Sequence, residues 1–492
     1  MDMTWFDDME RRIPKGEVRT RFAPSPTGYM HVGNLRTALY TWLIARSMGG
    51  KFLLRIEDTD QGRLVADAAD IIYKTLRQTG LTWDEGPDVG DPVGPYIQTE
   101  RRDFYAKYAH LLVEKGAAYY CFCEKTESEE DSGDFGRAAD PCRDLDPAAA
   151  KARVDAGEPF VIRQKIPAGT TTFSDAIYGD ITVDNADLDD QVLLKRDGLP
   201  TYNFANVIDD HLMGITHVVR GSEYLSSAPK YDLLYRAFGW DIPTYVHCSP
   251  VMRDAQNKMS KRHGDPSYED LLALGYLSEA VVNYVALLGW SPRGEYAETE
   301  FFTLDELVKV FDLHGISKSP AIFDIEKLKY FNAHYLRALE PDAFFAIAEP
   351  YLKEAIHTPS IDLKLVAPLV QPRCDTLLDI APQVDFFDAV PEYSNELYCH
   401  KKMKTDEANS KEALEWVIPA LEALPGWSFD AIHDCLIALA EAKELKNGRV
   451  MWPVRTALSG KAVTPGGAVE LCHILGREET LRRLRSGVAH LS

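Results

Sequence analysis

His31 and Gly33 occupy a position in the sequence that suits the binding of a phosphate group. The pattern predicts a strand over residues 18–22, a Pro- and Gly-rich turn over residues 24–28, and a helix from about Gly33 to Met48. Free N–H groups and the dipole at the start of a helix attract anions. Gly33 would let an adenine ring approach the backbone, and His31 could donate to phosphate oxygens while an α-phosphate is attacked. This turn is therefore a candidate nucleotide site.

A second candidate phosphate site lies in the middle of the chain, at residues 258–262. Its sequence is Lys-Met-Ser-Lys-Arg, which places three cations within five residues, and Gly264 follows. Such a loop could clamp the β- and γ-phosphates of a triphosphate as pyrophosphate leaves. A basic surface loop is the simpler interpretation of this segment alone, as a chance match is of a lone His-x-Gly. The presence of both segments favours one shared nucleotide site.

Together the two segments resemble the signature sequences of class I aminoacyl-tRNA synthetases, with residues 31–34 as the first signature and residues 258–262 as the second. This resemblance implies that ATP binds between them, accompanied by Mg²⁺. It implies His31, Lys258 and Lys261 as the catalytic residues, which act by positioning and charge stabilisation rather than as nucleophiles. The wider ATP-binding set that the resemblance implies is Ser25, His31, Gly33, Asn34, Lys258, Ser260 and Lys261.

Further segments resemble the glutamyl and glutaminyl branch of this class, namely residues 21–28, 54–60, 201–206, 209–215 and 220–223. The resemblance implies an ATP-dependent ligase that forms glutamyl-adenylate, releases pyrophosphate and transfers glutamate to the 3′-terminal adenosine of tRNA(Glu). A helical C-terminal third fits the bacterial glutamyl enzymes, because the glutaminyl enzymes carry a β-barrel there. Use of tRNA(Gln) stays open. Two alternatives also stay open, a glutaminyl-tRNA synthetase and an adenylate-forming nucleotidyltransferase that does not act on tRNA.

The residue types in these segments suit glutamate, which brings two carboxylates and one ammonium group to a partly buried pocket. Arg21 and Arg220 can each hold a carboxylate through two parallel hydrogen bonds. Glu57 can take the ammonium group, and Tyr202 and Asn206 can supply neutral hydrogen bonds that fix its orientation. Each side chain alone could equally form a structural ion pair or hydrogen bond. As a converging set, and by the same resemblance, they are expected to form the amino-acid pocket.

Three cysteines in one stretch of the chain raise the question of a structural metal. Cys121, Cys123 and Cys142 could supply three thiolates to Zn²⁺, which prefers four ligands in a tetrahedron. Asp144 stands where the fourth ligand is expected, with Asp140 and Glu124 as alternatives to it. Free cysteines in an acidic loop are the competing interpretation.

The elements that must position these residues begin as a parallel α/β layer, because short β-rich runs alternate with helical patterns. We expect a Rossmann-like catalytic domain in two halves, residues 1–98 and 204–242, interrupted by an α+β insertion at 99–203, which the resemblance implies to bind the acceptor end of tRNA. A domain that contacts the tRNA stem and carries the second signature is expected at 243–337. Ala, Leu and Glu at helical spacing predict an all-α region over 338–492, and the resemblance implies that this region binds the anticodon.

Size and composition limit the class of protein. At 492 residues the chain exceeds one hydrophobic core, so several domains are expected. The net charge of −22 argues against a nucleic-acid partner only as a global sum, since local basic clusters can still face one. Eight scattered cysteines indicate reduced thiols, and no long apolar run or basic leader is present. We expect a cytoplasmic monomer that does not bind membranes.

Overall fold

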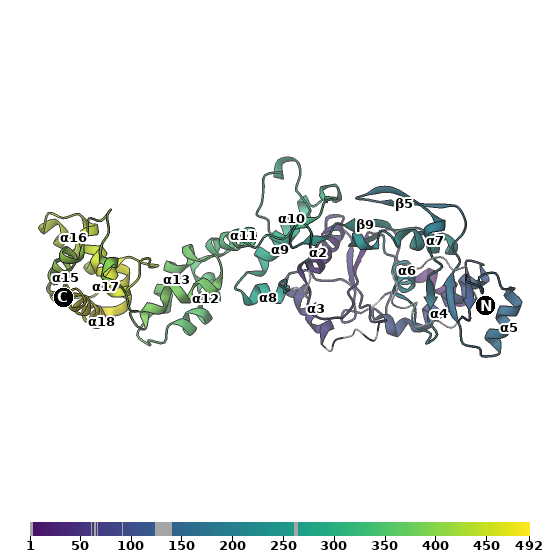
Figure 1. The fold of residues 1–492 in the computed structure, drawn as a ribbon, viewed down its shortest axis with the longest axis horizontal. Coiled ribbons are helices and arrows are strands. Elements are labelled where there is room, and N and C mark those ends of the chain that lie inside the picture. The colour runs from purple at the N-terminus through teal and green to yellow at the C-terminus, as the bar shows by residue number, and fades with distance from the viewer. Residues whose placement is uncertain are drawn as a thin grey trace. The chain divides into compact units, whose positions relative to one another are not determined.

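The computed structural model describes residues 3–60, 62, 65, 67–90, 92–123, 140–259 and 264–492. The chain divides into two compact units. The first consists of residues 1–271 and 281–325, and the second of residues 272–280 and 326–492. The described part of the first unit alternates strands with helices, and that of the second is built from helices (Figure 1).

A six-stranded sheet forms the centre of the first unit, in the order β2-β1-β8-β9-β5-β6. Every neighbouring pair is parallel except β5 and β6, which are antiparallel. Because β1, β8 and β9 are parallel, their carboxyl ends meet at one edge, where open α/β sheets bind ligands. The strands are β1 Arg19–Phe22, β2 Lys51–Leu54, β5 Thr170–Asp175, β6 Gly179–Asp184, β8 His217–Gly221 and β9 Thr244–Cys248.

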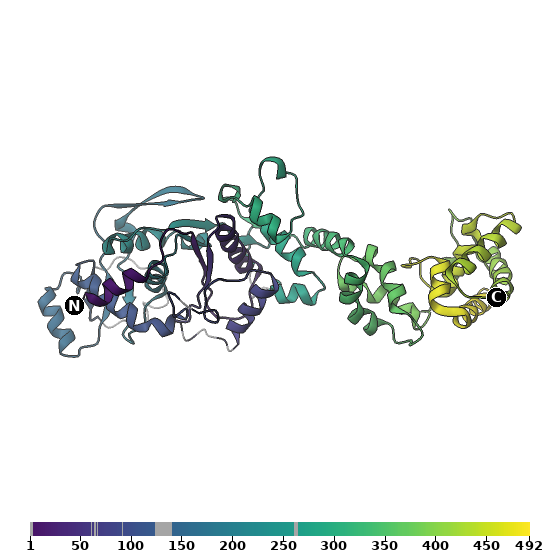
Figure 2. The ribbon, with the colours of Figure 1, turned by 180° about the vertical axis from the view of Figure 1, so that it is seen from behind.

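Helix α2, Val32–Ser47, packs on β1, β2 and β8 and also against α10, Leu304–Val310. Contact on several sides explains why α2 is apolar around most of its circumference. Helix α6 packs against α4 and α7, α7 also packs on β5, and α1 lies against α6 (Figure 2). The bounds of the remaining helices of this region are α1 Thr4–Arg12, α3 Ala68–Gln78, α4 Arg102–Glu114, α5 Pro147–Asp155, α6 Tyr202–Leu212, α7 Ala228–Phe238, α8 Tyr268–Ala273 and α9 Ser278–Ala286.

Two smaller sheets complete the first unit. One is antiparallel, with the order β3-β4-β7, and the other is a short parallel pair of β10 and β11. Aromatic residues such as Tyr105, Tyr231 and Tyr245 fill the core between the central sheet and its helices. The smaller strands are β3 Ala118–Cys121, β4 Val161–Gln164, β7 Val192–Leu194, β10 Val251–Met252 and β11 Ala321–Ile322.

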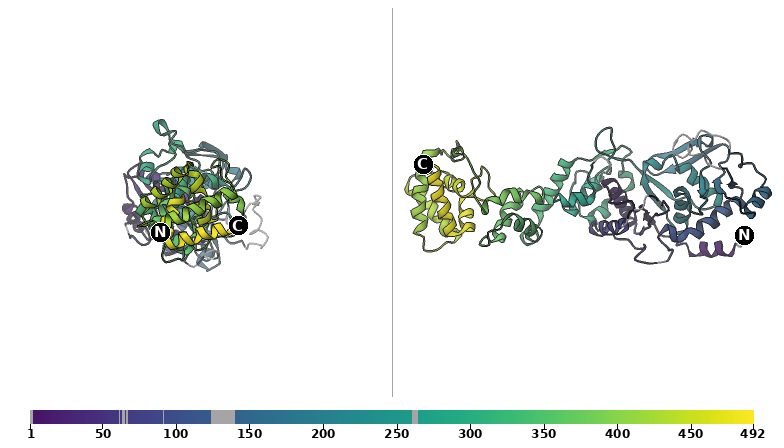
Figure 3. Two further views of the ribbon diagram at one scale, coloured as in Figure 1. Left: turned by 90° about the vertical axis from the view of Figure 1, so that its left-hand side faces the viewer. Right: turned by 60° about the horizontal axis from the view of Figure 1, so that its bottom comes forward.

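The second unit is helical throughout its described elements. Helices α15 to α18 pack on one another as one group near the C-terminus (Figure 3). Buried leucine, valine and phenylalanine side chains form a separate core in this unit. The bounds are α11 Ile325–Ala338, α12 Pro341–Ala355, α13 Leu363–Val370, α14 Ala381–Val384, α15 Glu407–Glu422, α16 Phe429–Ala442, α17 Asn447–Ser459 and α18 Ala468–His490.

The expected fold class is confirmed, with an α/β layer first and a helical C-terminal region after it. The expected strand at 18–22 and the expected helix at 33–48 agree with β1 and α2 to within one residue at each end. One feature differs from a simple insertion: β5 and β6, from within residues 99–203, extend the central sheet beside β9. No described helix has the length and apolar character needed to cross a lipid bilayer.

Candidate active site

A cavity of about 390 Å³ opens at the carboxyl ends of β1, β8 and β9, beside the first turn of α2. Residues far apart in the sequence share its wall. The cavity brings together nine of the residues that the sequence singled out, namely Arg21, Ser25, His31, Gly33, Asn34, Glu57, Tyr202, Arg220 and Lys258.

His31 caps the start of α2. Its backbone is extended, with φ −78° and ψ 161°, and its Nδ1 accepts the N–H of Asn34 at 3.3 Å. A neutral ring that accepts at Nδ1 carries its proton on Nε2, which leaves Nε2 as a donor. A Cβ atom at Gly33 would lie 3.0 Å from Cε1 of His31, so a larger residue there would press on the ring. The cap and the glycine thus fix the imidazole at the cavity.

The second signature reaches the same cavity at its first residue. Lys258 lines the cavity, and its backbone forms an antiparallel bridge with Met252 at the end of β10. A turn held by the Asp254 carboxylate and Asn257 precedes it. The expectations for Ser260 and Lys261 lie outside the described residues.

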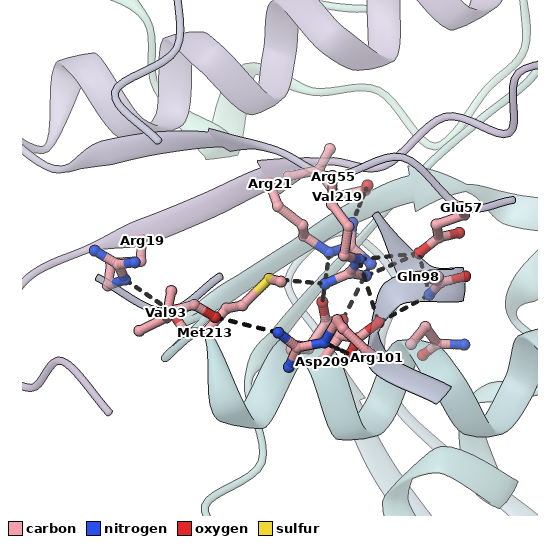
Figure 4. A network of polar contacts seen from close by, with 12 residues as sticks. Arg19, Arg21, Arg55, Glu57, Val93, Gln98, Arg101, Asp209, Met213 and Val219 are labelled. Atoms are coloured by element: carbon pink, nitrogen blue, oxygen red, sulfur yellow. Dashed lines mark hydrogen bonds and ion pairs between the residues drawn. The ribbon is translucent and has the colours of Figure 1, made fainter. Parts of the chain in front are cut away.

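Buried ion pairs connect the amino-acid side of the cavity (Figure 4). Arg21 grips Asp210 with two hydrogen bonds, from Nε at 2.9 Å and from Nη2 at 3.1 Å. Arg55 bridges Asp210 and Glu57, at 2.8 Å to each. Burial alone would raise the pKa of Asp210, but the charges of Arg21 and Arg55 hold it below its ordinary value. Asp210 is therefore ionised and balances much of the charge of Arg21.

The pKa of Glu57 is shifted in the opposite direction from that of Asp210. Burial raises the pKa of its carboxyl above the ordinary value, although Arg55 and Arg21 oppose this shift. Its Oε1 accepts hydrogen bonds from Arg55, while Oε2 is buried and has no hydrogen-bond partner among the described residues. An unpaired buried carboxylate oxygen is costly, so it suits a ligand that brings a cation.

Arg220 is the less neutralised of the two expected arginines. Its guanidinium lies over the rings of Tyr231 and Tyr224, at 4.4 and 5.2 Å from their centroids. Its Nη1 is buried and lacks a hydrogen-bond partner within the described part of the chain. A carboxylate that enters the cavity would therefore meet an available charge at Arg220, whereas Arg21 is already paired with Asp210.

Tyr202 and Asn206 both lie on α6 but differ in position. Tyr202 lines the cavity, with its ring tilted against Tyr224 at a centroid distance of 5.4 Å. Asn206 is buried behind the wall and does not line the cavity. Its Nδ2 donates to the backbone carbonyl of Tyr202 at 2.8 Å, so its contact with the site runs through Tyr202.

Arg55, Asp210 and Glu223 also belong to the site, although their residue types and spacing alone did not predict a role for them. Arg55 and Asp210 are buried and join the arginine and glutamate sides of the site, and Glu223 lines the cavity. A usable signal existed for the first two, because charged residues within apolar strand and helix patterns must find partners when buried. The sequence could not say which partners these were.

The cysteine cluster forms a separate candidate site in the first unit. The ligand atoms of Cys121, Cys123, Asp140 and Cys142 all lie within 4.8 Å of one another. Cys123 Sγ is 3.6 Å from Cys142 Sγ and 3.7 Å from an Asp140 oxygen. Ligands of a tetrahedral zinc ion with Zn–S bonds of about 2.3 Å are separated by roughly 3.7 Å, so the spacing fits.

Asp144 lies outside this cluster. Its side chain is 87% exposed and is paired with Lys165 at 3.5 Å. The turn that follows Cys142 carries it away from the sulfur atoms, whereas Asp140 also accepts the backbone N–H of Cys142 at 2.8 Å. This geometry replaces Asp144 by Asp140 as the candidate fourth ligand.

Two protein families together match most of the chain. Residues 17–330 match the family described as tRNA synthetases class I (E and Q), catalytic domain, and residues 343–488 match the anticodon binding domain family. The chain is 58% identical over 481 residues to a glutamate–tRNA ligase of Clostridium novyi, covering 96% of this chain and 98% of that protein. It is 55% identical over 482 residues to the ligase of Clostridium tetani, with 96% and 98% covered.

A solved structure supports the same family assignment. The crystal structure of a glutamate–tRNA ligase from Elizabethkingia meningosepticum, in complex with its amino acid, is 35% identical and superposes with a TM-score of 0.86. The match covers 97% of this chain and 100% of that one. The chain therefore belongs to the glutamate–tRNA ligase family of class I aminoacyl-tRNA synthetases.

Proposed function

We propose that this chain is an ATP-dependent ligase that activates glutamate as glutamyl-adenylate and transfers it to the 3′-terminal adenosine of tRNA(Glu). The observation that carries the proposal is that His31 and Lys258, from the two signature segments, line one cavity together with Arg220 and Glu57. Membership of the family supports the same reaction. The two alternatives, a glutaminyl enzyme and a nucleotidyltransferase without tRNA, are not favoured, because the similar proteins over nearly the whole chain are glutamate–tRNA ligases.

In the proposed first step, the α-carboxylate of glutamate attacks the α-phosphorus of ATP and pyrophosphate leaves. His31 donates from Nε2 to the phosphate, and Lys258 faces it from the opposite segment. Ser25, Gly33 and Asn34 complete the nucleotide wall. Ser260 and Lys261 would extend it from the second signature. Mg²⁺ accompanies ATP and balances phosphate charge. No enzyme nucleophile is required.

Glutamate is held between opposite charges in this proposal. Nη1 of Arg220 and Oε2 of Glu57 are buried and lack partners in the described chain, so a carboxylate and an ammonium group would satisfy them. Arg21 contributes positive charge beside Asp210, and the Tyr202 hydroxyl is assigned to orientation. Asn206 is assigned to the same task through Tyr202.

The direct experiment is aminoacylation with purified tRNA isoacceptors and labelled glutamate, with and without glutamine as a competitor. We expect charging of tRNA(Glu) that glutamine does not inhibit. Charging of tRNA(Gln) with glutamate in the same assay would widen the tRNA specificity and leave the amino-acid assignment unchanged. Use of glutamine in place of glutamate would contradict the proposal. We also propose that the protein is cytoplasmic and that its active form is a monomer. The mass measured in solution would test whether it is a monomer.

The same proposal divides the chain into five functional parts, with a catalytic domain at 1–98 and 204–242 and an insertion at 99–203. Residues 243–337 would contact the tRNA stem, and residues 338–492 the anticodon. The last boundary is supported by the two matched families, the first of which ends at residue 330 and the second of which begins at residue 343.

Glu57 makes glutamate use depend on pH. Burial raises the pKa of Glu57, so its carboxyl takes up a proton at a higher pH than an exposed glutamate does. A protonated carboxyl cannot balance the substrate ammonium. We therefore expect kcat/KM for glutamate to fall as the pH decreases through this raised pKa. In Glu57→Gln this acidic limb of the pH profile should disappear, and the overall activity should be low at every pH. An acidic limb that persists in Glu57→Gln would assign it to another group.

We also propose that Cys121, Cys123, Cys142 and Asp140 hold a structural zinc ion, because three sulfur atoms and a carboxylate fit its preferred donors. We expect one zinc per chain in the purified protein, weaker retention against a chelator in Asp140→Ala, and unchanged retention in the matched variant Asp144→Ala. Metal analysis and thermal melting are the readouts. Loss of zinc in Asp144→Ala alone would restore Asp144 as the ligand, and a zinc-free protein would favour free thiols.

A further inference from the structure

The side chain of Arg220 donates a hydrogen bond to a buried histidine, His247. Among the described residues, its side chain makes one hydrogen bond, from Nε to Nε2 of His247 at 3.4 Å. His247 lies on β9, next to β8, and is fully buried. It does not line the cavity, whereas Arg220 does. The guanidinium therefore has its Nε side anchored in the interior, and its Nη1 remains without a protein partner.

His247 is in turn held by Asp175, the last residue of β5. The Asp175 Oδ2 atom lies 2.7 Å from Nδ1 of His247 and also accepts the backbone N–H of His247 at 3.1 Å. Its other oxygen accepts the backbone N–H groups of Ile177 and Tyr178, both at 2.8 Å. Four hydrogen bonds thus fix this buried carboxylate.

These contacts determine where the imidazole proton lies. An ionised carboxylate only accepts, so Nδ1 of His247 must donate to Asp175. A guanidinium only donates, so Nε2 must present its lone pair to Arg220. Burial and the charge of Arg220 lower the pKa of His247, although the hydrogen bond with Asp175 opposes them. The two hydrogen bonds together require a neutral ring with its proton on Nδ1, and the lowered pKa also favours a neutral ring.

We propose that Asp175 and His247 are positioning residues for Arg220: Asp175 fixes the proton of His247 on Nδ1, so that Nε2 accepts from Arg220 Nε and the Nη groups face the glutamate carboxylate. This inference rests on the proposed role of Arg220 in binding glutamate. The three residues come from β5, β9 and β8, so the strand that residues 99–203 add to the sheet supports the amino-acid pocket.

A neutral acceptor suits this position better than a carboxylate. An acid against Arg220 would neutralise its charge, as Asp210 does for Arg21. The histidine satisfies the buried Nε–H and leaves the positive charge for the substrate. Loss of the acceptor would leave a buried N–H unpaired and free the guanidinium to turn on its stem.

The test compares two replacements of His247 of similar size. His247→Leu removes the acceptor, whereas His247→Gln keeps an amide oxygen that can accept from Nε of Arg220. We expect the leucine variant to raise the KM for glutamate about tenfold or more, and the glutamine variant to stay within about threefold of wild type. The KM for ATP should change little in either variant. Aminoacylation kinetics and thermal melting are measured on the full-length chain.

Asp175→Asn tests the proton position. An asparagine amide can donate to Nδ1, which favours the ring form with its proton on Nε2 and turns a donor toward the donor on Arg220. We expect a rise in the glutamate KM like that of His247→Leu, with ¹⁵N spectra of labelled histidine showing the protonated nitrogen exchanged. The His247→Gln spectrum identifies the signal by its loss.

The outcomes separate this inference from the proposed function. If Arg220→Met leaves the glutamate KM unchanged, the assigned role of Arg220 fails. If Arg220→Met raises the KM while His247→Leu and Asp175→Asn keep wild-type values, only the positioning role is overturned. Equal glutamate KM values in His247→Leu and His247→Gln, with lowered melting temperatures, would also overturn the positioning role. His247 would then be a packing residue.

Discussion

Arg220→Met is expected to raise the KM for glutamate about 100-fold or more, with a much smaller change in the KM for ATP. The arginine lines the cavity, and its buried Nη1 has no partner within the described chain, so its charge is available to a substrate carboxylate. Methionine keeps much of the length and apolar stem but removes the charge. Steady-state aminoacylation at varied glutamate and saturating ATP and tRNA measures the effect.

A matched control for this variant is Arg236→Met on α7. Arg236 also loses a charge in this replacement, but it is exposed and paired with Asp232 away from the cavity. Its KM for glutamate should equal that of wild type. An unchanged glutamate KM in Arg220→Met would remove Arg220 from the pocket and would shift the carboxylate assignment to Arg21, in spite of its pairing with Asp210.

His31→Ala is expected to lower kcat for adenylate formation by roughly 100- to 1,000-fold, the usual cost of losing a donor aimed at developing charge. Its Nδ1 is engaged by the N–H of Asn34, so Nε2 is the atom that can reach the phosphate. The KM for glutamate should change little, because Arg220 and Glu57 are left in place. Pyrophosphate exchange with tRNA present is the measurement.

The control for the histidine variant is His314→Ala. His314 is exposed in the short 3-10 helix Leu313–Gly315 and does not line the cavity, so the exchange rate of His314→Ala should match wild type. An exchange rate in His31→Ala within about threefold of wild type would be too small for a lost charge-stabilising donor. In that case the turn would serve only to shape the cavity.

The local parts of this site were predictable from the sequence because they follow short-range rules. A strand, a Pro- and Gly-rich turn and a helix place His31 at the first turn of α2, and the structure has this arrangement. The chemical needs of glutamate also selected residue types, and Arg21, Glu57, Tyr202 and Arg220 meet at one cavity. The helix-start position followed from the local pattern, whereas the choice of glutamate and of its pocket residues also depended on the resemblance to the glutamyl and glutaminyl branch.

The pairing of buried charges was not predictable in the same way. Arg21 and Asp210 are separated by 189 positions, and nothing local indicates that this carboxylate neutralises that arginine. The chain of Asp175, His247 and Arg220 likewise depends on which strands become neighbours. Asn206 points behind the wall because of its place on the α6 helix, and Asp140 rather than Asp144 faces the sulfur atoms because of the turn between them. These features follow from the tertiary fold.

The most direct measurement is a crystal structure of the protein with glutamyl-sulfamoyl-adenosine, a stable analogue of glutamyl-adenylate. We predict that its side-chain carboxylate contacts Arg220, its ammonium group contacts Glu57, and its sulfamoyl group lies beside His31 at the start of α2. An analogue bound in another cavity, or bound here with its carboxylate away from Arg220 and its adenosine away from residues 31–34, would contradict the account.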